Sequence, residues 1–135
     1  MREIDVALFG LLDGDAELKA LGATGVYRLG AVPREARRPF VAFGSYAPAP
    51  DAYTLGGWAS ASHQYVVKAV DEGQSAQRAQ ALAARVQALL TGQELAVAGY
   101  TVPVCRRQRA IEYDEVAGAT VYQHAGGIYL IVVAK

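Results

Sequence analysis

Apolar residues recur at helical spacing in two parts of the chain. The isoleucine and leucines of residues 2–12 predict an amphipathic helix, and Asp15 is placed to cap a second, shorter helix that follows. A longer alanine-rich helix is predicted over residues 76–91, with Ser75 as its cap and Gly92 as its end. The apolar stripe of this long helix consists of Ala79, Leu82, Ala83, Val86, Leu89 and Leu90.

Runs of strand-forming residues fill most of the remaining chain. The predicted strands cover residues 26–29, 40–46, 63–70, 100–113 and 120–134. Gly126-Gly127 predicts a bulge or bend in the last strand. Residues 128–133 are apolar at every position, so both faces of this strand should be covered: one by a helix, the other by a second sheet or a neighbouring subunit. The predicted fold is α+β, with N-terminal helices and the long alanine-rich helix packed across a mostly antiparallel sheet.

Residues 47–62 interrupt the pattern of strands. They contain two prolines and a Gly-Gly pair, so they predict a long, irregular and mobile loop. Tyr53, Leu55 and Trp58 lie in this segment. Apolar and aromatic residues on a long loop are typical of a contact site, although they can also fold back onto their own domain.

Composition adds a reason to look for an assembly. The chain has 135 residues, which suits one domain over residues 1–135. Hydrophobic residues make up 53% and charged residues 19%, and 13 basic residues balance 13 acidic ones. Zero net charge argues against a general nucleic-acid binder and against a membrane-surface protein. So much apolar material with so few charges must be buried in a core or in a subunit interface.

The sequence contains no recognisable catalytic or phosphate-binding motif. His63 and His124 both lie in predicted strands, and a small hydrolase or a two-histidine metal site would need them to meet a carboxylate such as Asp71 or Glu112. A strand-end histidine with a solvated or hydrogen-bonded ring is the simpler interpretation. Cys105 has no partner motif and is expected to be a small buried apolar residue. No cofactor and no metal are expected.

One segment concentrates charge. On a regular strand Arg107 and Arg109 lie on one side and Arg106 on the other, and Asp114 and Glu115 follow shortly after. These residues are interpreted either as complementary surfaces for subunit contacts or as solvated strand edges that prevent aggregation. A nucleic-acid-binding module that uses the arginine clusters is a further alternative.

The order of these features resembles a phage family. The leucine-containing stretch ALFGLLDGDAELKAL runs into the strand GVYRLGAVP, and RPFVAFGSY and a loop with DAYTLGG follow. The strand-to-helix unit HQYVVKAVDEGQSAQRAQALAARVQALL and the closing segment YDEVAGATVYQHAGGIYLIVVAK complete the pattern. Together they resemble the small tail terminator, or tail completion, proteins of long-tailed phages and prophage-derived particles, over nearly the whole chain.

The resemblance implies a structural role without catalysis. Proteins of this kind form a hexameric ring on the head-proximal end of the completed tail tube, stop its polymerisation and present the surface that joins the head. The implied partners are further copies of the chain, the major tail tube protein and a head-completion or connector protein, with DNA passing through the lumen without specific binding and no membrane involved. The implied location is the virion tail, after assembly in the host cytoplasm.

Contact residues for such a ring are inferred from the patterns above. Tyr53, Leu55 and Trp58 are expected to dock, while Arg107 and Arg109 are expected to set the register against Asp114 and Glu115. The nearest alternative function is another head–tail connector or minor tail component. The hydrolase built on His63 and His124 and the nucleic-acid-binding module remain the alternatives outside this class.

Overall fold

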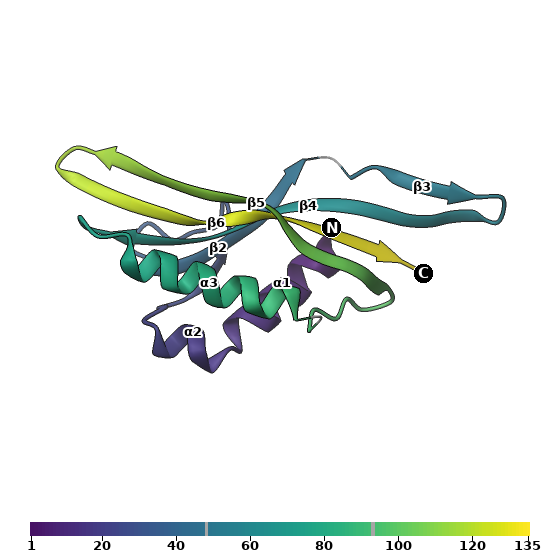
Figure 1. Ribbon diagram of the computed structural model, residues 1–135, viewed down its shortest axis with the longest axis horizontal. Coiled ribbons are helices and arrows are strands. Elements are labelled where there is room, and N and C mark those ends of the chain that lie inside the picture. Colours follow the sequence, from purple (N-terminus) through teal and green to yellow (C-terminus); the bar gives the residue numbers. More distant parts are fainter. Residues whose placement is uncertain (48, 93) are drawn as a thin grey trace.

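A computed structural model describes residues 1–47, 49–92 and 94–135. Within these residues the helices are α1 (Arg2–Asp13), α2 (Ala16–Ala20) and α3 (Gln77–Thr91). The strands are β1 (Val26–Arg28), β2 (Phe40–Ala47), β3 (Asp51–Thr54), β4 (Gly57–Glu72), β5 (Thr101–Ala117) and β6 (Thr120–Ala134). The helices lie together on one face of the sheet, and two hairpins, β3–β4 and β5–β6, extend from it in opposite directions (Figure 1).

The strands of the described residues form one six-stranded sheet. Its order is β1-β2-β4-β6-β5, and β3 pairs with the start of β4. Among these described strands only β1 and β2 pair in parallel, and the other pairs are antiparallel. The predicted α+β class with a mostly antiparallel sheet is therefore confirmed.

The main core lies between the helices and the sheet. Alternate residues of β4, including Tyr65, Val67 and Ala69, point to the helices and are fully buried. Because alanines lie along the α3 stripe, this helix can pack closely on the strands. The helical residues of this core are Ile4, Leu8, Leu12, Leu18, Ala79, Leu82, Val86, Leu89 and Leu90.

The predicted helix starts are correct for α2 and one residue early for α3. The backbone N–H of Leu18 donates to the Asp15 carboxylate over 3.0 Å, which caps α2 as predicted. Helix α3 begins at Gln77 instead of residue 76, and the Ser75 hydroxyl accepts the Gln77 N–H over 3.2 Å. In the described part of the chain no helix is long and apolar enough to cross a membrane.

The second face of the sheet is covered only in part. Near β1 and β2 a small core of Phe40, Ala42 and Val70 is capped by the segment that follows β1, through Val32 and Ala36. None of the three described helices lies over the remaining stretch of β4, β6 and β5 (Figure 1). This uncovered face, which we call the open face, carries the half-buried apolar residues Val66, Val104, Leu130 and Val132.

The glycine pair of β6 does not form the predicted bulge. The pairing of β6 with β4 runs without a shift through Gly126 and Gly127. Both glycines are instead sites of close approach: a Cβ on Gly126 would lie 2.2 Å from the Val67 carbonyl oxygen, and one on Gly127 would lie 2.5 Å from the Arg107 Cδ. The shift occurs in β5, between Arg107 and Arg109.

The segment 47–62 is not an irregular loop. Residues Asp51–Thr54 form β3, and β4 already begins at Gly57, so a two-residue turn joins the strands. Gly57 has φ of +109°, a conformation that glycine adopts without strain. The described residues of this segment are therefore largely a β-hairpin, while Pro48 lies outside the described residues. The expected mobility stays a prediction.

Candidate assembly surfaces

The tip of the β3–β4 hairpin exposes apolar side chains. Leu55 is fully exposed in the turn, and Tyr53 is 69% exposed on β3. The hairpin extends beyond the helices at one end of the molecule, so nothing in the described residues covers its tip (Figure 1). An apolar projection of this kind is typical of a contact surface between proteins.

Trp58 has a different environment from Tyr53 and Leu55, the two residues predicted to dock with it. It packs against the main core, its ring meets Tyr100 edge to face at 6.0 Å between centroids, and its Nε1–H donates to Asp51 over 2.9 Å. Because the indole is held on both sides, Trp58 anchors the hairpin close to its turn, where it pairs with Tyr53. Tyr53 and Leu55 are thus exposed, whereas Trp58 is half-buried, and docking through these three residues stays a prediction.

A β-bulge divides the arginines of β5 in a way that the sequence pattern did not predict. Arg107 pairs with Tyr129, which faces the helices, whereas Arg109 pairs with Ile128 on the opposite side of β6. Arg107 and Arg109 therefore lie on opposite faces, and the expectation of a shared side is wrong. Arg106 shares the open face with Arg109, whose guanidinium donates to the Tyr46 hydroxyl over 3.3 Å.

The acidic end of β5 is partly engaged within the chain. Glu115 lies 2.8 Å from His124 Nε2, and the His124 ring stacks on Tyr113 at 4.4 Å between centroids. Lys68 donates to the Tyr113 hydroxyl over 2.8 Å. Asp114 is exposed. Glu115 is thus held by a histidine of its own chain, and Asp114 is the freer of the two predicted acidic contacts.

The two histidines do not form a site together. In the pairing of β4 with β6, His63 lies opposite Ile131 and His124 opposite Val70, seven residues further along β4. At about 3.3 Å per residue this separates them by roughly 23 Å and puts them on opposite faces. The carboxylates proposed as their partners are engaged elsewhere: Asp71 pairs with Arg78 at 2.8 Å, and Glu112 accepts a hydrogen bond from Gln80. The expectation that the histidines could share a site is wrong.

Stability is expected to fall as the pH drops from 7 to 5, in part because of His124. Burial, the largest cause, lowers the pKa of His124, although its hydrogen bond to Glu115 acts in the opposite direction. The unfolded chain, in which histidine titrates near pH 6.5, therefore binds a proton that the folded chain resists, so this contribution is present above pH 6.5 and is lost below it. Urea unfolding at several pH values measures this effect. The free energy of unfolding should change less with pH in His124→Gln than in the wild type.

His63→Gln serves as the matched control for this prediction. Burial also lowers the pKa of His63, so that variant should remove only its own share of the pH dependence. If wild type and His124→Gln have the same slope between pH 5 and 7, the interpretation of His124 fails.

Other candidate chemistry is weak within the described residues. Cys105 is half-buried and packs against the core, and burial raises the pKa of its thiol to about 11, so it is an apolar packing residue that is less buried than predicted. In residues 1–47, 49–92 and 94–135 no group of three His, Cys, Asp or Glu side chains is placed to hold a metal ion.

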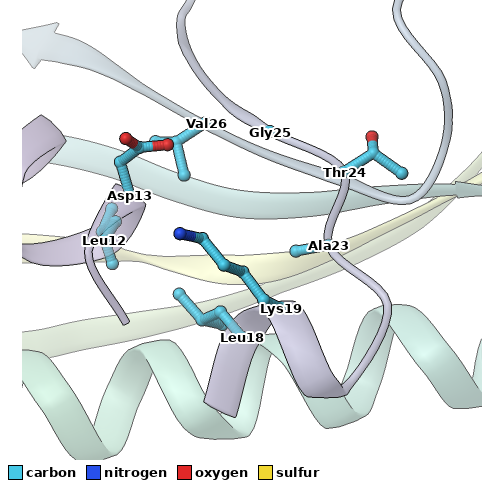
Figure 2. A pocket seen from close by; sticks show the side chains of 8 residues that line it. All are labelled: Leu12, Asp13, Leu18, Lys19, Ala23, Thr24, Gly25 and Val26. Atoms are coloured by element: carbon cyan, nitrogen blue, oxygen red, sulfur yellow. The ribbon is translucent and has the colours of Figure 1, made fainter. Parts of the chain in front are cut away.

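A small hollow lies between the end of α1, α2 and the segment that leads into β1. Figure 2 shows Leu18 and Lys19 of α2 on one side and Thr24, Gly25 and Val26 on the other. Its volume is about 140 Å³, which is below the roughly 300 Å³ at which small-molecule sites begin. This hollow does not suggest a ligand site.

Comparison with known proteins agrees with an assembly role. The family model described as tail completion protein gp17 matches residues 6–121. Among solved structures, a chain from the virion of a native gene transfer agent particle has a similar fold, with a TM-score of 0.80 and 24% sequence identity. The match covers 98% of this chain and 95% of that chain. No curated protein sequence matched.

The sequence resemblance is thereby confirmed at the level of the family. The matched segment runs from α1 into β6 and includes the hairpin, the bulged strand β5 and the long helix α3. The chain belongs to the tail completion protein gp17 family and is a structural protein of a phage-type tail.

Proposed function

We propose that six copies of this chain close into a ring at the head-proximal end of a phage-like tail tube. The ring ends tube polymerisation and provides the surface to which the head attaches. Its role is structural and not enzymatic. Its partners are the major tail tube protein on one side and a head-completion or connector protein on the other.

The observation that carries the proposal is the tail completion match over residues 6–121. The geometry supports it, because a closed ring needs two different patches on each copy that meet head to tail. An exposed apolar hairpin tip at one end of the molecule and the largely uncovered open face, which carries both apolar and charged residues, supply separate surfaces of this kind. The solved chain with a similar fold comes from a virion, which agrees with a place in the particle.

The proposal also covers the path of the DNA, the location of the protein and the contact residues. DNA passes through the lumen without tight binding, which suits a chain with no net charge. The protein acts in the virion tail, after assembly in the host cytoplasm. Tyr53 and Leu55 dock, with Trp58 as their support. Arg107 and Arg109 meet Asp114 and Glu115 of a neighbour, and each arginine acts on a different face of the sheet.

Imaging with purified tail tubes tests this proposal. The protein should bind one end of each tube, appear as a ring in negative-stain micrographs, and prevent further growth when tube subunits are added. In the element that encodes it, loss of the gene should give tubes longer than normal because nothing ends their growth.

Two outcomes would contradict the proposal. A protein that stays monomeric both alone and with tubes cannot be the ring. Headless tubes of normal length after gene loss would favour the alternative of a connector that joins a tube already ended by another protein.

A further inference from the structure

An apolar groove lies between α1 and β1. Val6 and Phe9 of α1 form one wall, and Tyr27 and Ala31 form the other, around a volume of about 410 Å³. Val6 is 59% and Phe9 46% exposed, although the opposite side of α1 is fully buried. Helix α1 is therefore apolar on two sides, and the described residues of the chain cover only one of them.

The polar groups of the groove are already paired. Asp5 accepts a hydrogen bond from the Tyr65 hydroxyl over 2.7 Å and forms an ion pair with Arg28 Nε at 3.3 Å. A site for a small polar ligand keeps a few convergent polar groups for recognition. Since the Asp5 carboxylate is engaged on both sides, the groove is suited to an apolar side chain.

The chain itself presents a matching projection. Leu55 and Tyr53 stand at the tip of the β3–β4 hairpin, which extends away from the helices, whereas α1 lies under the middle of the sheet (Figure 1). The tip of one copy therefore points away from its own groove. The charges of the two surfaces are also complementary. Asp51, whose Oδ1 accepts the Trp58 indole N–H, is the only charged residue in segment 49–62, and the Arg28 side chain at the groove is largely exposed.

We propose that Leu55 and Tyr53 of one copy dock into the α1–β1 groove of the next copy. The contact joins two different patches, so it is heterologous and can close a ring by repetition. Asp51 then approaches Arg28 of the neighbour, whose remaining guanidinium N–H groups are free to donate beside the pair with Asp5. The inference rests on the proposed ring and assigns the receptor surface that the hairpin requires.

Disulfide trapping tests the contact directly. Protein carrying Leu55→Cys is mixed with protein carrying Phe9→Cys under mild oxidation, and crosslinked dimers are measured on non-reducing gels. Val116→Cys replaces Phe9→Cys in the control, because Val116 is 70% exposed on the other hairpin. The half-buried Cys105 contributes little background, since burial raises its pKa to about 11. The 55–9 pair should crosslink at least tenfold more than the 55–116 pair; equal yields overturn the proposal.

A second measurement uses charge in place of a crosslink. Leu55→Asp and Val6→Asp should each weaken ring formation by about tenfold or more, because each removes apolar contact area and buries a carboxylate. Val116→Asp makes the same change at an exposed apolar site outside the contact and should leave the ring intact. The thermal midpoint of the monomer should be unchanged in all three variants, which excludes unfolding as the cause.

The outcomes separate this inference from the proposed function. If the wild-type protein forms no ring even with tubes, the proposed function itself fails. If the wild type forms rings and both Leu55→Asp and Val6→Asp do so equally well, only the inferred contact fails. If Leu55→Asp leaves the ring intact but abolishes tube binding, the hairpin docks on the tube protein, and the inference is again overturned.

Discussion

Replacing Gly126 by alanine is expected to destabilise the protein by about 3 kcal/mol, at the upper end of the usual cost of overpacking. A Cβ at this position would lie 2.2 Å from the Val67 carbonyl oxygen and 2.5 Å from the Lys68 Cα. Both obstacles are backbone atoms of the paired strand β4, so the clash is relieved only if the two strands move apart. Urea unfolding followed by circular dichroism measures the effect.

Two other glycines provide the controls. At Gly127 a Cβ would meet the Arg107 side chain, which can move, and the Arg109 carbonyl oxygen at 2.9 Å, so alanine there should cost less than at Gly126. At Gly10 in α1 nothing lies within 4 Å of the added Cβ, and alanine should stabilise the helix by about 0.5–1 kcal/mol. If Gly126→Ala and Gly10→Ala have similar free energies of unfolding, the inference that β6 approaches β4 closely at Gly126 is wrong.

The second large effect is expected at Ile131, the β6 residue that faces the main core. Its side chain is fully buried under the helices, so Ile131→Ala should cost about 2–5 kcal/mol. The adjacent Leu130 lies on the open face and is only half-buried, so Leu130→Ala should cost about 1 kcal/mol in the isolated chain. Equilibrium unfolding of the two variants compares the faces of one strand directly.

The same pair of variants also measures coverage of the open face in the assembly. If a neighbouring copy or partner covers Leu130, the cost of Leu130→Ala should grow when stability is measured in the assembled particle. The cost of Ile131→Ala should stay the same. If the two variants lose the same free energy of unfolding in the isolated chain, the open face is as well packed as the face under the helices.

Much of the fold follows from local sequence patterns. The leucines of α1, the cap at Asp15 and the alanine stripe of α3 identified the helices, because helical spacing and capping are properties of neighbouring residues. A run of strand-forming residues likewise predicts the closing strand β6 at Thr120–Ala134, as observed. Burial of β6 on its helical face also followed from the unbroken apolar run.

The β3–β4 hairpin was missed because prolines and glycines dominated the interpretation of its segment. Gly56-Gly57, placed between a short strand-forming run and Trp58, is a known signal for a tight hairpin turn and could have identified it. The length of β4, which continues from the hairpin into the central sheet, depends on pairing with β6. Such pairing is a long-range property that no local pattern contains.

The candidate surfaces were predicted less completely than the fold. The sequence pattern predicts Tyr53 and Leu55 as contact residues, but it does not predict the groove of Val6 and Phe9. The leucines of the same helix define only its buried side. The prediction that the two histidines could be neighbours is wrong because a sequence pattern that gives the strands does not give their register. A search for apolar residues on the second side of α1 would have found the groove.

The bulge between Arg107 and Arg109 also affects how relatives of this chain should be aligned. In a paired strand every residue after an inserted position changes faces, so the bulge reverses the phase of residues 109–117. Tyr113 and Glu115 therefore meet His124 on the open face, while Glu112 meets Gln80 of α3. A relative with a one-residue gap here would exchange these two sets of side chains without any change in composition. In β5, a gap is thus as informative about surface chemistry as a substitution.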